Sequence, residues 1–156
     1  MVELPTGVRA LKSWTLDISI PGQPISWNAS YRVGKVTRTG QHGRLRLDPD
    51  GKRVEASTIV KTEKAKAYTK RVAELAGWAR NSLGWEALEP RFIVVEFSYY
   101  LGRDIDCDNV MKLVDDGLET ALGVDDKWFL PRAMSKVVGL RPEDRKLDLR
   151  IYPAGD

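Results

Sequence analysis

Three aspartates alternate along the run YYLGRDIDCDNVMKLVDD near the middle of this chain. Asp104, Asp106 and Asp108 follow directly on an apolar, strand-like segment, so their carboxylates are crowded. Two close carboxylates repel, and one tends to stay protonated unless a cation neutralises the pair. A hard divalent ion such as Mg²⁺ takes oxygen ligands and keeps waters that can attack a phosphate. The spacing therefore points to metal-assisted chemistry on phosphates.

Helix capping is the simpler explanation of the same residues. Asp108 stands where a following helix needs an N-cap, and further acids favour the positive end of its dipole. We accept that explanation for Asp104, Asp115 and Glu119 taken singly. For Asp106 with Asp108 it would need two acids to do what one does, so we expect this pair to bind metal.

Lys112 lies one turn after Asp108 on the polar face of the expected helix. It could stabilise charge on a reacting phosphate, or it could be an i, i+4 partner of Asp108 and Asp116 worth about 0.2 to 0.5 kcal/mol. The residues alone leave both roles open. Asp125 and Asp126 follow the helix in the sequence VDDK, where an aspartate pair is ordinary turn chemistry.

Hydrophobic periodicity predicts the elements that position these residues. The pattern is one of strands and two amphipathic helices, with Gly84 and Gly123 closing the helices. We expect strands at 14–20 and 92–100, helices at 62–83 and 108–122, and a final hairpin of strands at 134–140 and 147–152. This order predicts a single α/β (α+β) domain over residues 1–156, with a small mixed sheet and two helices.

Charge is divided along the chain although the net charge is only +3. Residues 32–71 hold twelve Lys or Arg against four acids, whereas residues 96–126 hold nine acids against two bases. A glycine-rich, aperiodic stretch at about 34–61 predicts a long basic loop that could follow a nucleic-acid backbone. A solvated surface is the plainer interpretation of the basic half by itself.

Several classes of protein are disfavoured by composition. Neither a membrane-spanning apolar run nor the apolar centre of a signal peptide is present, so we expect a cytoplasmic protein. Cys107 is the single cysteine and His42 the single histidine, which excludes an internal disulfide and a zinc site built from these residues. Any metal would be held by oxygen.

The run DCDNVMKLVDDGLETALGVDDK, beginning at Asp106, resembles the signature of the RusA-like Holliday junction resolvases. That signature is D-x-D-N-x-x-K followed by an aspartate at the end of the next helix. Asp106, Asp108 and Lys112 match its leading positions. The final metal-binding aspartate falls on Asp126, with Asp125 as its neighbouring alternative.

A second run, ISIPGQPISWNASYR, is similar to the strand, proline turn, Asn and Tyr or Arg near the start of that family. The resemblance makes Asn28, Tyr31 and Arg32 candidate substrate contacts. The basic stretch at about 34–61 is longer than a minimal member of the family would have, and it could be a substrate clamp or an inert insertion.

The resemblance implies a structure-selective endodeoxyribonuclease that resolves four-way (Holliday) DNA junctions by paired symmetric nicks in recombination and repair. It implies catalytic roles for Asp106, Asp108, Lys112 and Asp126, the three aspartates binding one or two Mg²⁺ ions that Mn²⁺ can replace. It also implies a homodimer acting on four-way or branched DNA, from a bacterial cell or a phage. The expected DNA contacts are Asn28, Tyr31, Arg32, Lys64, Lys70, Arg71 and Arg103.

The sequence is also compatible with two other functions. Another metal-dependent phosphohydrolase could use the same carboxylates on small nucleotides, but it gives no reason for the basic half. A catalytically silent dimer that binds branched DNA would need the acids only as a capped helix, and it would bind equally well in magnesium and in chelator.

Overall fold

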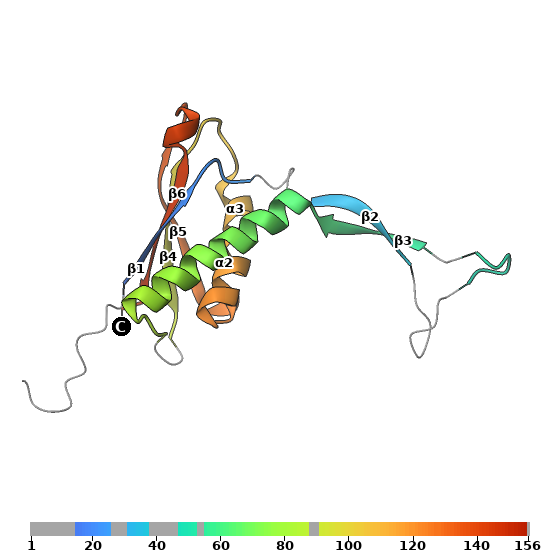
Figure 1. The fold of residues 1–156 in the computed structure, drawn as a ribbon, viewed down its shortest axis with the longest axis horizontal. Coiled ribbons are helices and arrows are strands. Elements are labelled where there is room, and N and C mark those ends of the chain that lie inside the picture. Colours follow the sequence, from blue (N-terminus) through green and yellow to red (C-terminus); the bar gives the residue numbers. More distant parts are fainter. Residues whose placement is uncertain (1–14, 26–30, 38–46, 53–54, 88–90, 156) are drawn as a thin grey trace, which may run out of the picture.

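The computed structural model describes residues 15–25, 31–37, 47–52, 55–87 and 91–155, with residues 31–37 and 55–60 described by their backbone. It is a small α+β fold of strands and two main helices (Figure 1). In chain order these are β1 (Leu16–Pro21), β2 (Tyr31–Thr37), β3 (Glu55–Lys61), α2 (Glu63–Leu83), β4 (Ile93–Tyr100), α3 (Cys107–Leu122), β5 (Phe129–Val137) and β6 (Lys146–Pro153). Short 3₁₀ turns, η2 (Asp126–Trp128) and η3 (Pro142–Asp144), precede β5 and β6.

A four-stranded mixed sheet forms the centre of the fold, in the order β1, β6, β4, β5. β6 is antiparallel to both of its neighbours, and β5 is parallel to β4. The predicted hairpin of the last two strands is wrong, because β4 lies between β5 and β6. Its apolar run makes β4 an interior strand, and η3 lies in the connection that brings the chain from β5 to the far side of β4.

Helix α2 begins and ends where the sequence predicts. Thr62 is its N-cap and accepts a hydrogen bond from the Ala65 N–H at 3.2 Å. Gly84 closes it with φ +62°, a left-handed conformation that favours glycine. Its buried residues recur every three to four positions and are Ala65, Tyr68, Val72, Ala76 and Ala79.

Helix α3 packs closely across α2 at Gly117. A side chain there would bring its Cβ to 2.8 Å from the Thr69 carbonyl oxygen and 2.9 Å from Val72 Cβ. Two hydrogen bonds tie the same pair of helices: Thr69 Oγ1 donates to the Leu113 carbonyl at 3.2 Å, and Arg80 Nη1 donates to the Ala121 carbonyl at 2.9 Å. Because residue 117 is glycine, α3 can pack this closely on α2. This packing sets the orientation of the polar face of α3.

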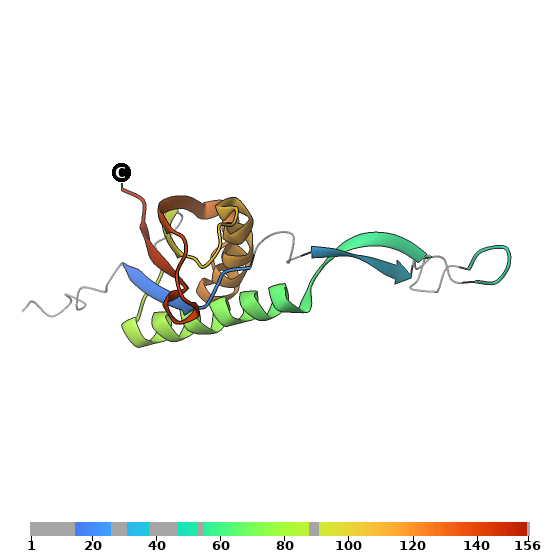
Figure 2. The same cartoon turned by 90° about the horizontal axis from the view of Figure 1, so that it is seen from above.

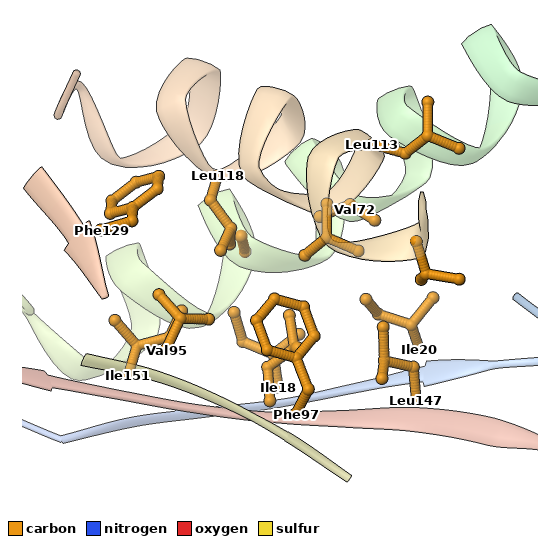
Figure 3. Packing of buried hydrophobic residues seen from close by; sticks show 14 of the residues in the cluster. Ile18, Ile20, Val72, Val95, Phe97, Leu113, Leu118, Phe129, Leu147 and Ile151 are labelled. Carbon is orange, nitrogen blue, oxygen red and sulfur yellow. The ribbon is translucent and has the colours of Figure 1, made fainter. Parts of the chain in front are cut away.

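The hydrophobic core fills the space between the sheet and both helices (Figure 3). Alternate residues of β4 supply Val95 and Phe97, while α2 and α3 supply Val72 and Leu118. Within the described part of the chain, no helix combines the length and the apolar character needed to cross a membrane.

The predicted basic loop at 34–61 is in part a two-stranded antiparallel ribbon, in which Tyr31 is opposite Lys61 and Thr37 is opposite Glu55. We call β2 and β3 together the basic ribbon. It projects beyond the N-terminal end of α2, away from the central sheet (Figures 1 and 2). The sequence missed these strands because β2 and β3 pair only with each other, so no large sheet imposes an apolar alternation on them.

Candidate active site

The connection from β4 to α3 carries the three alternating aspartates and is fixed at its start. The Leu101 N–H donates to the Val137 carbonyl at 2.8 Å. Gln23 then holds two backbone groups: its Oε1 accepts from the Gly102 N–H at 2.8 Å, and its Nε2 donates to the Arg103 carbonyl at 3.3 Å. Gln23 is a positioning residue that the sequence did not reveal, because it lies about 80 residues away in the chain.

Gly102 in this connection packs directly against the side chain of Arg145. A Cβ at this position would lie 2.1 Å from Arg145 Nε, which itself donates to the Leu140 carbonyl at 3.0 Å. The arginine side chain thus occupies the space that any other residue at 102 would need. The backbone that leads to the aspartates is thus held between Gln23, in the segment after β1, and Arg145, between η3 and β6.

Asp106, and not Asp108, is the N-cap of α3. Its backbone is extended, with φ −72° and ψ 118°, and its Oδ1 accepts a hydrogen bond from the Asp108 N–H at 3.2 Å. Asp108 lies in the first helical turn, and both side chains are exposed. The capping explanation thus accounts for one oxygen of Asp106 and leaves the Asp108 carboxylate without a capping role.

Lys136 on β5 joins this group, although the sequence gave no sign of it. Its ammonium forms an ion pair with Asp104, which lowers the pKa of that carboxyl below its usual value and raises the pKa of the lysine. Asp106 and Cys107 also lie within electrostatic range of Lys136. We call Asp104, Asp106, Asp108 and Lys136 the helix-start cluster. A shallow hollow of about 350 Å³ opens between Asp104, Ile105, Asp106 and Lys136.

A second acidic group lies further along α3, and we call Asp115, Asp116 and Asp126 the mid-helix cluster. Burial, with repulsion from Asp126 and Asp116, raises the pKa of Asp115 to about 7. Its Oδ1 is buried and has no hydrogen-bond partner among the described residues. Lys112 partly offsets the rise in pKa. Asp116 is ion-paired with Lys61, the last residue of the basic ribbon.

Asp125 and Asp126 have different roles in the turn after α3. Asp125 caps η2, because its Oδ1 accepts from the Lys127 N–H at 3.0 Å, and this hydrogen bond lowers the pKa of the carboxyl. Its other oxygen lies 3.5 Å from the Lys127 ammonium. Asp126 is exposed and acts electrostatically on Asp115. Asp125 is thus held by the turn, whereas Asp126 is the aspartate of this pair that lies within electrostatic range of Asp115 on α3.

The candidate ligands have the oxygen donors that a hard cation prefers, but their side chains are not gathered around one point. Asp106, Asp108 and Asp126 all offer carboxylate oxygens, and the crowding of Asp115 with Asp126 is a repulsion that a cation would relieve. Over the described ranges, however, no three Asp, Glu, His or Cys side chains lie close enough together to hold a metal ion. The magnesium site remains a prediction about these residues.

The expected DNA contacts are spread over three elements. Lys64, Lys70 and Arg71 are exposed on α2, where Lys70 lies 3.9 Å from Glu74, and Arg103 is exposed beside the helix-start cluster. Tyr31 and Arg32 begin strand β2 at the base of the basic ribbon, where the backbone alone is described. Asn28 falls outside the described residues. Lys61, at the same base, contacts α3 directly, so the ribbon joins the domain next to the mid-helix cluster.

Comparisons with known proteins give little guidance for this chain. No protein-family model matches it, and no curated protein matches it significantly. It is similar to the solved structure of IspF from Plasmodium falciparum in complex with CDP, at 9% identity and a TM-score of 0.32, over 89% of this chain and 94% of that one. It is also similar to 2C-methyl-D-erythritol 2,4-cyclodiphosphate synthase from Plasmodium vivax, at 11% identity and a TM-score of 0.31, over 89% and 95% of the two chains. Likenesses this weak carry no argument about function.

Proposed function

We propose that this protein is a Mg²⁺-dependent endodeoxyribonuclease that resolves four-way DNA junctions by paired symmetric nicks, acting in recombination and repair in the cytoplasm of a bacterial or phage-infected cell. The observation that carries the proposal is the placement of Asp106, Asp108 and Lys112. They follow the D-x-D-N-x-x-K pattern of the RusA-like resolvases, and all three are exposed over the first turns of one helix. The basic ribbon adds support, because it joins the domain beside that helix.

The proposed reaction is hydrolysis of a phosphodiester at the start of α3. Asp106, Asp108 and Asp126 would hold Mg²⁺, which supplies a water of lowered pKa and neutralises charge on the scissile phosphate. Lys112, one turn along the helix from Asp108, would hold a non-bridging phosphate oxygen and stabilise the charge that grows there. The cap at Asp106 and the Gln23 contacts fix the backbone that presents these groups.

The proposed substrate binding is electrostatic and follows the DNA backbone. The exposed Lys64, Lys70 and Arg71 on α2 and the charges of residues 31–61 are suited to phosphates. Within residues 31–61 there are eight Lys or Arg against three acids. Such contacts give affinity that falls steeply with salt and carry little sequence information, which suits an enzyme that selects a branched structure.

A nicking assay tests the proposal directly. The wild type and Asp108→Asn are incubated with a labelled four-way junction and a matched linear duplex, in magnesium and in chelator. Asp144→Asn is the matched control, because Asp144 is an exposed aspartate in η3 that belongs to neither acidic cluster. We expect paired nicks in the junction that require magnesium, with a loss of about 100-fold or more in Asp108→Asn and none in Asp144→Asn.

Two other results would assign a different function. Tight junction binding without nicks in any divalent metal would leave a catalytically silent DNA-binding protein. Metal-dependent hydrolysis of small nucleotides, with the junction untouched, would indicate a nucleotide phosphohydrolase that uses the same carboxylates.

A further inference from the structure

Two parallel strands end beneath the start of α3, and each directs one side chain to it. Tyr99 on β4 and Lys136 on β5 are register partners, so their side chains lie on the same face of the sheet. Tyr99 is fully buried, and its hydroxyl donates a hydrogen bond to the Cys107 carbonyl at 3.3 Å. That carbonyl belongs to the backbone between Asp106 and Asp108. Lys136 thus reaches the helix-start cluster from the strand beside the one that fixes its backbone.

Lys136 lines the hollow of about 350 Å³ that opens at the helix-start cluster. The other residues that line it are Asp104, Ile105 and Asp106. Lys136 lies within electrostatic range of Asp106, which is a proposed metal ligand. Its side chain is 37% exposed, so an incoming ligand has access to it. A phosphate group that approached Asp106 from this side would therefore meet the ammonium group of Lys136.

Asp104 holds this lysine in an ion pair that can be exchanged. The aspartate side chain is 71% exposed, and exposed ion pairs contribute little to stability. The backbone of Ile105 also hydrogen-bonds to Asp104 and helps to lower its pKa, so the carboxylate keeps a partner if the lysine leaves. Carboxylate and phosphate oxygens both accept charge-assisted hydrogen bonds from an ammonium group. The ion pair is therefore no obstacle to a contact between Lys136 and a phosphate.

A second lysine–aspartate pair, on the opposite face of the sheet, provides a structural comparison. Lys146 on β6 is the register partner of Tyr100, its ammonium lies 4.9 Å from the centre of that ring, and it is 2.9 Å from Asp148. Its side chain is 42% exposed, close to the value for Lys136. Among the described residues, those that line the hollow beside it do not include the proposed metal ligands. This pair has the same chemistry without an adjacent candidate active site.

We propose that Lys136 is a phosphate-binding residue of the candidate active site. Asp104 holds its ammonium group beside Asp106 until a phosphate of the DNA enters the hollow and takes the place of the Asp104 carboxylate. The exchange requires the charges of Asp106 and Asp108 to be neutralised, because free carboxylates repel a phosphate. Lys112 on α3 and Lys136 on β5 then supply positive charge from two separate elements. The inference deepens the proposed function and rests on it for the identity of the ligand.

Binding of a labelled four-way junction, followed by fluorescence anisotropy in calcium, tests this contact. Calcium takes oxygen ligands as magnesium does, but in a looser geometry, and gel electrophoresis checks that the junction stays intact. Lys136→Gln should weaken binding about three- to tenfold, because the phosphate contact that is lost replaces an existing ion pair. It should also reduce the slope of log affinity against log salt by about 1, the value for one phosphate contact. Lys136→Arg keeps the charge and should retain most of the affinity, and the control Lys146→Gln should leave the slope unchanged.

Asp104→Asn should have the opposite effect on binding. It frees Lys136 from its ion pair and should tighten binding by up to about fivefold. Asp148→Asn is the matched control, which measures the effect of removing one negative charge from the other lysine–aspartate pair. In a Lys136→Gln background, Asp104→Asn should tighten binding no more than Asp148→Asn does, because the lysine that it would free is absent.

The results separate this inference from the proposed function. Circular dichroism should show an unchanged fold in the variants, because both ion pairs are at least partly exposed. Wild-type affinity and salt slope in Lys136→Gln, together with paired nicking by the wild type in magnesium, would overturn the inference and leave the proposed function standing. A reduced slope in Lys136→Gln without nicking by the wild type would support the phosphate contact and contradict the proposed function. A wild type that binds no DNA would overturn both.

Discussion

The two acidic clusters of α3 use the same residue type in opposite environments. In the helix-start cluster the carboxylates are exposed, and each oxygen that is held accepts from a backbone N–H or from Lys136. In the mid-helix cluster Asp115 is half-buried, its buried Oδ1 has no hydrogen-bond partner among the described residues, and Asp126 lies within electrostatic range of it. The pKa of Asp104 is accordingly lowered and that of Asp115 raised.

The difference follows from burial and repulsion between neighbouring acids at Asp115, and from the ion pair with Lys136 at Asp104. Asp106 and Asp108 are exposed to solvent, whereas Asp115 is stabilised in its protonated form. A divalent ion bound near Asp126 would reverse that preference.

Two substitutions of Asp106 separate its capping role from its proposed role in metal binding, and we expect the largest effect on activity here. Asp106→Ser keeps a side-chain oxygen for the Asp108 N–H but removes the carboxylate, whereas Asp106→Ala removes both. We expect both variants to lose nicking by about 100-fold or more, and only the alanine variant to lose about 1 kcal/mol of stability. Junction assays and urea unfolding measure the two quantities. A serine variant that still nicks would show that Asp106 is a cap and nothing more.

Gly117→Ala should force helices α2 and α3 apart and lower the stability of the fold. The new methyl group would meet the Thr69 carbonyl and Val72, so α3 must shift away from α2. We expect a loss of about 1 to 3 kcal/mol in the free energy of unfolding. Gly77→Ala is the control, because nothing lies within 4 Å of a Cβ at that helical position, and it should be neutral or slightly stabilising. Equal stability of the two variants would contradict the close packing at Gly117.

Asp115→Asn should remove the part of the pH dependence of stability that Asp115 causes. The folded-state pKa of Asp115 is raised to about 7, so the folded protein holds a proton that the unfolded chain releases near pH 4. Stability is therefore lost as pH rises from about 4 through 7. Asparagine removes this loss, and we expect the variant to gain about 1 to 2 kcal/mol over the wild type at pH 8 and much less at pH 5, in metal-free buffer. Thermal melts at both pH values test it; a gain independent of pH would show that Asp115 is not the group titrating.

The smallest effect concerns Lys136. Removing its charge with Lys136→Gln takes away the main cause of the lowered pKa of Asp104, so that pKa should rise toward its usual value. Titration of the side-chain carboxyl signals by NMR measures the change. Lys127→Gln is a control that should move the pKa of Asp125 and leave Asp104 unaffected. An unchanged Asp104 would place Lys136 elsewhere in solution.

The sequence predicted the helices well because their signals are local. Gly84 and Gly123 close α2 and α3 as predicted, and most of the apolar stripe is buried, although Leu83 at the end of α2 is exposed. The interior position of β4 followed from its apolar run. The pairing of β5 and β6 was wrong because strand order depends on contacts between distant segments, which a turn-like sequence between two strands does not determine.

The residues of the candidate site that lie close together in the sequence could be predicted, and those that come from distant segments could not. Asp106, Asp108 and Lys112 stand within one run, so their common helix could be inferred. Assigning the cap to Asp106 rather than Asp108 required the observed start of α3. Gln23, after β1, holds the backbone that leads to the cluster, and Lys136 on β5 pairs with Asp104; both lie far from the cluster in the sequence, so no spacing rule could indicate them.

The basic ribbon has a consequence for engineering. Tyr31 and Lys61 are paired at its base, and each rung of the ladder joins one residue of β2 to one of β3. Removing one residue from each strand together therefore shortens the ribbon by one rung, about 3.3 Å, while its base stays joined to the domain. Because the side-chain face alternates with each rung, removals in steps of two keep the outward face constant. A graded set of such deletions would measure how the affinity for DNA depends on the length of the ribbon, if the proposed contact with the DNA backbone is made there.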